Sequence, residues 1–238
     1  MAISGLSLGL GLGIGGAPGS AFSNSYSVDF DGTNDYVAMN GAASDMQGLS
    51  TLTMSFWVKA ASYSVNPMAF AINWPGNGLL IYTHNSGNAN KTQVWYGADL
   101  FAASTPQSLG QWDHVCYVQR ASDDHTLYIN GNSVATSSAS YSVNSGADQV
   151  VVGGTTRFTQ YHGGLIDEVA LWKRGVTVSE VAAIYNGGTP GSLSSLNPFG
   201  WWRMGDNDGG TGTTITDQGS GANNGTLTNG PTFSTDVP

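Results

Sequence analysis

The sequence is poor in cysteine and in charged residues, and each shortage excludes a class of protein. A single cysteine, Cys116, among 238 residues excludes an internal disulfide, whereas secreted animal domains of this size usually carry them. Charged residues make up only 10% of the chain, and 16 acids against seven bases give a net charge of -9. This balance argues against binding to nucleic acid or to an anionic membrane, because both partners are negatively charged.

Glycine, by contrast, is abundant, with 34 residues. Many glycines and little charge favour strands joined by tight turns over a helical protein. Residues 51–59 alternate strictly, with Leu52, Met54, Phe56 and Val58 on one face of a strand. At least five runs show this period of two, which predicts an antiparallel β-protein. Cys116 lies in one such run, so we expect a buried, inert thiol.

Residues 163–172 form the most informative run, because two acids interrupt an apolar and β-forming stretch. Burying a carboxylate is costly unless it is paired or bound to a metal. Alternation places Asp167 and Glu168 on opposite faces of a strand, so we expect one of them to face the core or to lie at an irregular edge. Residues 177–180 then read Thr-Val-Ser-Glu, a capping box, which predicts one short helix near residues 178–186.

Six short motifs occur in the order that is typical of one protein family. They are FDGTNDYV at 30–37, TLTMSFWVK at 51–59, GQWDHV at 110–115, LYING at 127–131, VVVGG at 150–154 and GGLIDEVALW at 163–172. Together they resemble the laminin-G-like branch of the concanavalin A-like lectin/glucanase superfamily, over about residues 26–187. The resemblance implies an all-β fold, a two-sheet antiparallel jelly-roll sandwich with one short helix.

This reading divides the chain into three parts. They are a Gly/Leu-rich arm at residues 1–22, the sandwich at 23–188 and a C-terminal extension at 189–238. The extension contains GWWRMGD at 200–206 and NGTLTNG at 224–230, which resemble a segment that normally precedes such a sandwich. Because the segment follows the sandwich here, it packs either on its own sandwich or on that of a neighbour. The C-terminal extension resembles the tail segments of structural proteins from tailed marine phages that carry such domains.

The family resemblance also implies a structural Ca²⁺ ion. In the family this ion is held by the Asp of the closing strand and by carbonyl oxygens near the first hairpin. Carried over by position, the ligands are Asp167, Asp31 and Gly32. Ca²⁺ prefers about six to eight oxygen ligands, and Asp167 is otherwise hard to explain in an apolar strand. The alternative is a carboxylate that is satisfied by backbone amides.

The glutamates argue against catalysis. Glucanases of this fold place two carboxylates on one strand, and a retaining mechanism needs them about 5–5.5 Å apart. This chain has two glutamates, Glu168 and Glu180, and the second belongs to the capping box. No strand carries the paired pattern, and neither a serine nucleophile elbow nor a HExxH motif occurs. We therefore expect no enzymatic activity.

Aromatic residues point to binding instead. The aromatic residues at or near predicted loops are Trp74, Tyr82, Trp95, Tyr96, Phe158 and Tyr161. Their ring faces could stack on sugar rings across the concave sheet, and the first four are the candidate binding residues. The alternative is that they fill the sandwich core, as Trp and Tyr often do.

The favoured interpretation is a non-enzymatic structural protein of a phage particle, on the head exterior or the tail, that also touches host glycans. Its partners would be other virion proteins or copies of itself, and its location would be the virion. One alternative is a secreted microbial lectin, for which a signal peptide is expected. The other is a glycan-cleaving enzyme, for which paired glutamates on one strand are expected.

Residues 1–21 alternate apolar side chains with Ser and Gly, the apolar positions being Leu6, Leu8, Leu10, Leu12 and Ile14. The segment is too rich in glycine for a helix and lacks the basic region of a signal peptide. Burying a leucine is worth about 1.5–3 kcal/mol, and fixing each residue's backbone costs about 1–2 kcal/mol. Because the two terms nearly cancel, we expect the arm to pair with the sheet edge of another chain. The alternative is an arm folded back on its own sandwich.

Deleting residues 1–20 is therefore expected to leave the sandwich folded and to abolish incorporation into an assembly, because the arm supplies main-chain pairing only to a neighbour. Circular dichroism reports the fold of the truncated protein, and sedimentation velocity reports its assembly. A truncated protein that assembles like the full chain would show the docking arm to be wrong.

Overall fold

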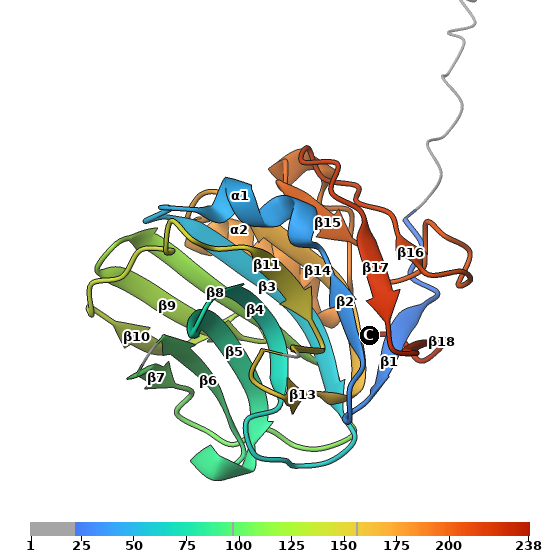
Figure 1. Cartoon of the computed structure of the whole chain (residues 1–238), viewed down its shortest axis with the longest axis horizontal. Helices are drawn as coiled ribbons and strands as arrows, with labels where there is room; N and C mark the ends of the chain where they lie inside the picture. Colours follow the sequence, from blue (N-terminus) through green and yellow to red (C-terminus); the bar gives the residue numbers. More distant parts are fainter. Residues whose placement is uncertain (1–21, 97, 156) are drawn as a thin grey trace, which may run out of the picture.

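The computed structural model describes residues 22–96, 98–155 and 157–238, and these residues form two antiparallel sheets packed face to face (Figure 1). The predicted all-β sandwich of the jelly-roll type is confirmed. The predicted arm residues Leu6, Leu8, Leu10, Leu12 and Ile14 lie outside the described residues.

The first sheet, called sheet A here, has the strand order β10-β9-β8-β3-β14-β1-β18, and β15 pairs with the second half of β14. Its strands are β1 (Ser27–Asp31), β3 (Leu52–Ala60), β8 (Asp113–Ala121), β9 (Asp124–Ile129), β10 (Asn132–Ser137), β14 (Gly163–Trp172), β15 (Gly200–Trp202) and β18 (Thr232–Ser234).

The second sheet, sheet B, has the order β16-β17-β2-β11-β4-β5-β6-β7. Its strands are β2 (Tyr36–Ala38), β4 (Met68–Trp74), β5 (Asn77–Asn85), β6 (Lys91–Tyr96), β7 (Ala98–Ala102), β11 (Gln149–Val152), β16 (Thr214–Ile215) and β17 (Gly225–Thr228). A separate small hairpin pairs β12 (Gly154–Thr155) with β13 (Gln160–Tyr161). The helical elements are α1 (Ala43–Met46), α2 (Val178–Tyr185) and four 3₁₀ turns, η1 (Asn40–Ala42), η2 (Ser86–Asn88), η3 (Asn186–Gly188) and η4 (Ser194–Leu196).

Alternation along β3 shows how the sequence builds the core. Leu52, Met54, Phe56 and Val58 all lie in the apolar cluster between the two sheets. The intervening residues face the other way, where the Trp57 ring stacks 5.9 Å from the ring of Tyr185. The side-chain period of two therefore fixes both the strand and its register.

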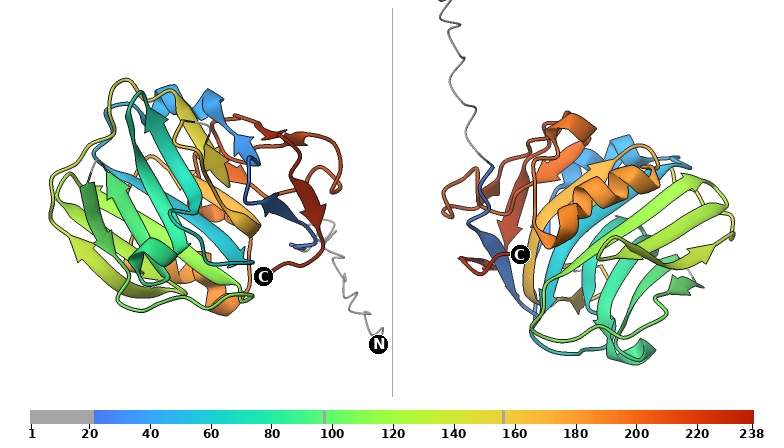
Figure 2. Two further views of the ribbon diagram at one scale, coloured as in Figure 1. Left: turned by 60° about the horizontal axis from the view of Figure 1, so that its bottom comes forward. Right: turned by 180° about the vertical axis from the view of Figure 1, so that it is seen from behind.

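Helix α2 covers the outer face of sheet A, as the view from behind shows (Figure 2). Its capping box is confirmed, because Thr177 Oγ1 accepts from the backbone N of Glu180 and the Glu180 carboxylate accepts from the backbone N of Thr177. Val181 and Ile184 are buried in a second apolar cluster with Cys116. Burial raises the pKa of the Cys116 thiol to about 12, which agrees with the inert thiol expected from the sequence.

The C-terminal extension pairs with strands of its own sandwich at three places. β15 joins β14, β17 joins β2, and β18 joins β1. In Figure 1 the red strands β17 and β18 of the extension accordingly lie beside the blue strands β2 and β1. Of the two alternatives left open by the sequence, the structure shows the extension completing its own sandwich. Within the described ranges, no helix is both long and apolar enough to cross a bilayer.

Candidate functional site

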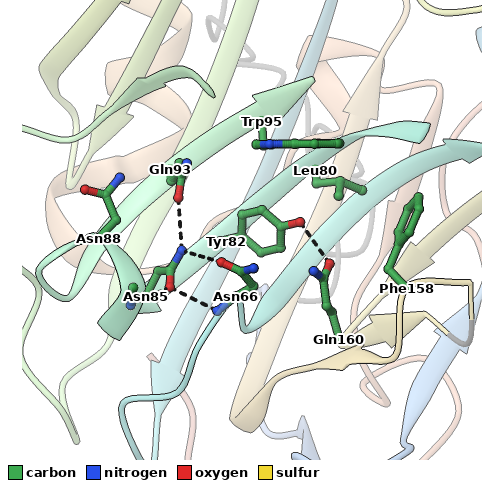
Figure 3. Close-up of a pocket in the computed structure, with 10 residues that line it drawn as sticks. Asn66, Leu80, Tyr82, Asn85, Asn88, Gln93, Trp95, Phe158 and Gln160 are labelled. Carbon is green, nitrogen blue, oxygen red and sulfur yellow. Dashed lines mark hydrogen bonds between the residues drawn. The ribbon is translucent and has the colours of Figure 1, made fainter. Parts of the chain in front are cut away.

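The outer face of sheet B carries a pocket of about 380 Å³. Its walls come from β5, β6, the turn η2 and the segment that leads into β13, as Figure 3 shows. A small apolar cluster that is separate from the sandwich core underlies this face. The lining residues are Asn66, Leu80, Tyr82, Asn85, Gly87, Asn88, Gln93, Trp95, Phe158 and Gln160.

Strand alternation decides which of the predicted aromatic residues reach this pocket. In the β5–β6 ladder Leu80 pairs with Trp95, and Tyr82 pairs with Gln93. Residues opposite each other or two apart point to the same face of a sheet, so all four line the pocket. Tyr82 and Trp95, two of the four predicted sugar-binding aromatics, are therefore brought together.

Trp74 and Tyr96 do not line this pocket, which corrects the prediction for these two residues. Tyr96 follows Trp95 directly, so its side chain points to the opposite face, toward the core. Its ring centroid lies 5.5 Å from that of Trp74 and 4.0 Å from that of Tyr141. Trp74 is itself 5% exposed and belongs to the core cluster. The sequence left open whether these rings bind sugar or fill the core, and Trp74 and Tyr96 fill the core.

A bulge in β5 adds Asn85 to the pocket face. The ladder between β5 and β6 shifts register between Tyr82 and Asn85, and His84 within this gap has a positive φ of 54°. Without the bulge, Tyr82 and Asn85 would point to opposite faces, since they are three residues apart. The bulge therefore places an amide side chain beside an aromatic one.

Asn85 holds the polar part of the pocket together. Its Nδ2 donates to Asn66 Oδ1 at 3.0 Å and to Gln93 Oε1 at 2.9 Å. Its Oδ1 accepts from the backbone N of Asn66 and of Gly87, each at 3.0 Å. An amide side chain has two donor hydrogens and two acceptor positions, so Asn85 is fully committed to this scaffold.

The other wall combines aromatic and amide groups. Tyr82 Oη donates to Gln160 Oε1 at 2.8 Å, which ties β5 to β13. Trp95 and Phe158 are partly exposed at the pocket, so their ring faces are accessible to a ligand. Sequence reasoning did not predict the amide residues, because isolated Asn and Gln in a chain rich in turns give no spacing signal.

Among the residues whose side chains the structure describes, the pocket lining includes no acid, no base and no histidine. General acid–base catalysis needs a titratable group within hydrogen-bond reach of the substrate, and this pocket offers no carboxylate pair. What the arrangement can do is hold a neutral molecule that carries hydroxyl groups, by stacking on rings and by hydrogen bonds to amides.

The acid pair of β14 lies on the opposite sheet, on a second bulge. The β14–β3 ladder shifts register between Asp167 and Ala170, and Glu168 has a positive φ of 45°. Ile166 and Val169 both belong to the core between the sheets, so the two acids share the outer face of sheet A. Of the two placements expected from the sequence, the core or an irregular edge, neither acid takes the first, because the bulge adds a residue to the strand.

Both acids are buried, and both have partners. Glu168 accepts from Trp201 Nε1 at 2.6 Å and from Arg203 Nε at 2.8 Å. Arg203 also donates to the backbone O of Ser23 at 2.5 Å. Burial raises the pKa of Glu168 to about 7, against the opposing effect of the Arg203 guanidinium. Burial, followed by the charge of Glu168, raises the pKa of Asp167 well above its usual range.

The predicted calcium ligands do not form one site. Asp31 pairs with Gly163, whereas Asp167 lies four residues further along β14. Asp31 ends β1 and Gly32 follows it in the turn, where the Asp31 carboxylate accepts from the backbone N of Thr33 at 2.7 Å. The predicted set of calcium ligands is therefore corrected, because the strand register places Asp31 and Gly32 away from Asp167.

Around Asp167 the structure offers different oxygen atoms. Its carboxylate accepts from Asn24 Nδ2 at 2.8 Å and from the backbone N of Glu168 at 2.7 Å, so the amide alternative is realised in part. Asn24 Oδ1, on the same amide, is buried without a hydrogen-bond partner. No three His, Cys, Asp or Glu side chains converge on one metal position within residues 22–96, 98–155 and 157–238. A Ca²⁺ ion at Asp167, which stays a prediction, would therefore depend on amide and carbonyl oxygens.

Asp167→Ala is expected to lower the free energy of unfolding by about 2–5 kcal/mol, the cost of removing one partner from a buried charged network. If Asp167 holds Ca²⁺, EDTA lowers the melting temperature of the wild type and leaves that of Asp167→Ala unchanged. Asp31→Ala is the matched control and should keep the wild-type response, since Asp31 lies away from Asp167. An equal EDTA response in the wild type and in Asp167→Ala would remove Asp167 as a ligand.

Comparison with solved structures shows a widespread fold. A candidate carbohydrate-binding protein from Bacteroides ovatus superposes with a TM-score of 0.67 at 18% identity, over 91% of this chain and 62% of that one. The chain thus spans less than two thirds of that protein. Domain 4 of AbnA, an extracellular GH43 arabinanase from Geobacillus stearothermophilus, in complex with arabinotriose, gives 0.55 at 19% identity, over 67% and 76%. The CBM40 of a Ruminococcus gnavus IT-sialidase, bound to α2,3-sialyllactose, gives 0.57 at 17%, over 67% and 96%.

At these identities the superpositions show the fold alone, and no curated protein matches the sequence. A family profile of the laminin-G type, described as the concanavalin A-like lectin/glucanases superfamily, matches residues 31–182. This match covers more than half of the chain and includes the six motifs at least in part. The chain therefore belongs to the concanavalin A-like lectin/glucanases superfamily.

Proposed function

We propose that this protein is a non-catalytic carbohydrate-binding module whose ligand lies in the pocket on the outer face of sheet B. The observation that carries the proposal is the pairing of accessible rings, Trp95 and Phe158, with amide side chains on the same face. Sugar rings present apolar C–H faces and polar edges, and this pocket offers a complementary surface to each.

The rigidity of the pocket also supports binding. Tyr82, Asn85 and Gln93 are almost fully buried, at 4%, 1% and 5% exposure, and hydrogen bonds connect Asn85 to two neighbouring side chains. A preformed pocket avoids part of the entropy cost of ordering side chains when a ligand binds. The site is therefore built before the ligand arrives.

The structural comparisons support the same class of ligand. Two of the similar structures are domains in complex with arabinotriose and with α2,3-sialyllactose. By name, both domains are parts of glycan-cleaving enzymes, an arabinanase and a sialidase. The present chain is therefore compared with the binding modules of such enzymes. No carboxylate occurs among the described residues that line the present pocket, which supports a binding role over a catalytic one.

We also propose a finer role, in which the module is a structural protein of a phage particle that uses the pocket to touch host glycans. Its partners there are other virion proteins or copies of itself. Two sequence features support this role: the resemblance of segments 200–206 and 224–230 to those of phage structural proteins, and the apolar alternation of residues 1–21. The assembly measurement on the protein lacking residues 1–20 tests this part separately from glycan binding.

Trp95→Ala is expected to weaken glycan binding about tenfold or more, because stacking on an aromatic face and burying the ring against a sugar together exceed about 1.4 kcal/mol. Binding is measured on an array of oligosaccharides and then by calorimetry with the strongest probe. Because Trp95 also packs on the small apolar cluster beneath it, the melting temperature of the variant is expected to fall, and circular dichroism must show that the protein is still folded.

Tyr63→Ala is the matched control for this experiment. Tyr63 is an aromatic residue with 39% exposure that does not line the pocket, so its loss should leave binding unchanged. A folded Trp95→Ala protein that binds as well as the wild type would show that the ligand lies elsewhere or that no glycan is bound.

A further inference from the structure

The pocket on sheet B contains ten lining residues, and not one of them carries a charge at neutral pH. Two basic residues lie close to the pocket without lining it. Lys91 pairs with Asn85 across the β5–β6 ladder and therefore points to the same face of the sheet, and Arg157 precedes Phe158. The Arg157 guanidinium donates through Nη2 to Asp148 Oδ2 at 3.1 Å, while its Nη1 is buried without a hydrogen-bond partner. Among the described residues, the pocket lining itself therefore offers a ligand no basic side chain.

An anionic sugar would lose more free energy by leaving water for this pocket than it would gain from contacts there. Moving a carboxylate or sulfate out of water is costly unless a charged partner compensates it, and such anions in proteins are usually held by Arg or Lys. The net charge of -9 adds a long-range repulsion against any anionic ligand. The cost of desolvation and the long-range repulsion both weaken the binding of an anionic sugar.

We propose that the pocket selects uncharged sugars and discriminates against glycans that carry sialic acid or sulfate. This inference rests on the proposed carbohydrate-binding function and names the ligand class of the same site. It separates this chain from the similar CBM40 structure, which is bound to α2,3-sialyllactose.

The hydrogen bonds inside the pocket fix which polar groups remain for such a ligand. Asn66 Oδ1 accepts from Asn85, and Gln160 Oε1 accepts from Tyr82, so each of these amides keeps its NH₂ group for the cavity. Figure 3 shows both side chains at the pocket, with their hydrogen-bonded oxygens turned toward Asn85 and Tyr82. The pocket thus presents N–H donors, which suit the hydroxyl and acetamido oxygens of a neutral sugar.

The size of the pocket limits the part of the glycan that it holds. Its volume of about 380 Å³ lies near the lower end of the range of roughly 300–1,000 Å³ that is usual for small-molecule sites. A short unit, a mono- or disaccharide at one position of a glycan, fits this space better than a long segment. Selectivity is therefore decided by the few groups on that unit.

The test uses the full chain on an array of matched probes, in which lactose, N-acetyllactosamine and arabinotriose stand beside sialylated and 6-sulfated forms of the first two. The expected result is binding to at least one neutral probe, with an affinity at least about tenfold higher than for its charged counterparts. Trp95→Ala should lose the neutral binding.

The two levels of the proposal fail in different ways. Equal or stronger binding to the sialylated or sulfated probe, lost in Trp95→Ala, would overturn the neutral selectivity and leave the binding site in place. No binding to any probe above the signal of Trp95→Ala would overturn the carbohydrate-binding function and the selectivity with it.

One variant tests the cause of the selectivity directly. Asn88 is partly exposed at the rim, in the turn η2, and can be changed without disturbing the buried amides. Asn88→Lys supplies the missing positive charge and should raise the affinity for the sialylated probe by about tenfold relative to Asn88→Gln, the uncharged control. If a folded Asn88→Lys protein shows the same preference as Asn88→Gln, the lack of charge is not what excludes anionic glycans.

Discussion

A buried carboxylate needs a partner, and in this sandwich Glu168 finds its partners on a segment more than 30 residues further along the chain. Trp201 and Arg203, at the end of β15 and just after it, both donate to its carboxylate. Arg203 in turn holds the backbone of Ser23, and its guanidinium lies 4.2 Å from the ring centre of Phe22. One charged contact thus ties the closing strand, the C-terminal extension and the start of the described chain together.

This arrangement has a consequence for function. Helix α2 and the residues around Trp201 cover the outer face of sheet A, so that face is occupied by the protein's own chain. The pocket lies on the outer face of sheet B, where only a small apolar cluster lies beneath the rings of Tyr82 and Trp95. The outer face of sheet A is therefore covered by the protein's own chain, whereas the outer face of sheet B carries the pocket for which we propose a binding function.

Much of the fold follows from the sequence, because alternation and family motifs act over short distances. The alternation of residues 51–59 and the capping box at 177–180 each predict a local element that the structure contains. The bulges at His84 and Glu168 could not be predicted in this way, since a residue is added to a strand only in response to its neighbours in the sheet. These bulges bring Asn85 to the pocket and place Asp167 and Glu168 on one face, which is why the site was predicted only in part. One error was avoidable: Trp95 and Tyr96 are adjacent in a strand, so they could not both face the same ligand.

The most direct test of this account is a double-mutant cycle between Glu168 and Arg203, measured by denaturant unfolding of Glu168→Gln, Arg203→Gln and the double variant. If the buried pair joins the extension to the closing strand, Arg203→Gln should cost about 3–5 kcal/mol, because it leaves the Glu168 carboxylate buried without its charged partner. Glu168→Gln should cost less, because Arg203 keeps a second acid, Asp206, at 3.0 Å. The double change should then cost much less than the two single changes together, with a coupling above about 1 kcal/mol. Additive single costs, or single costs near zero, would contradict the account.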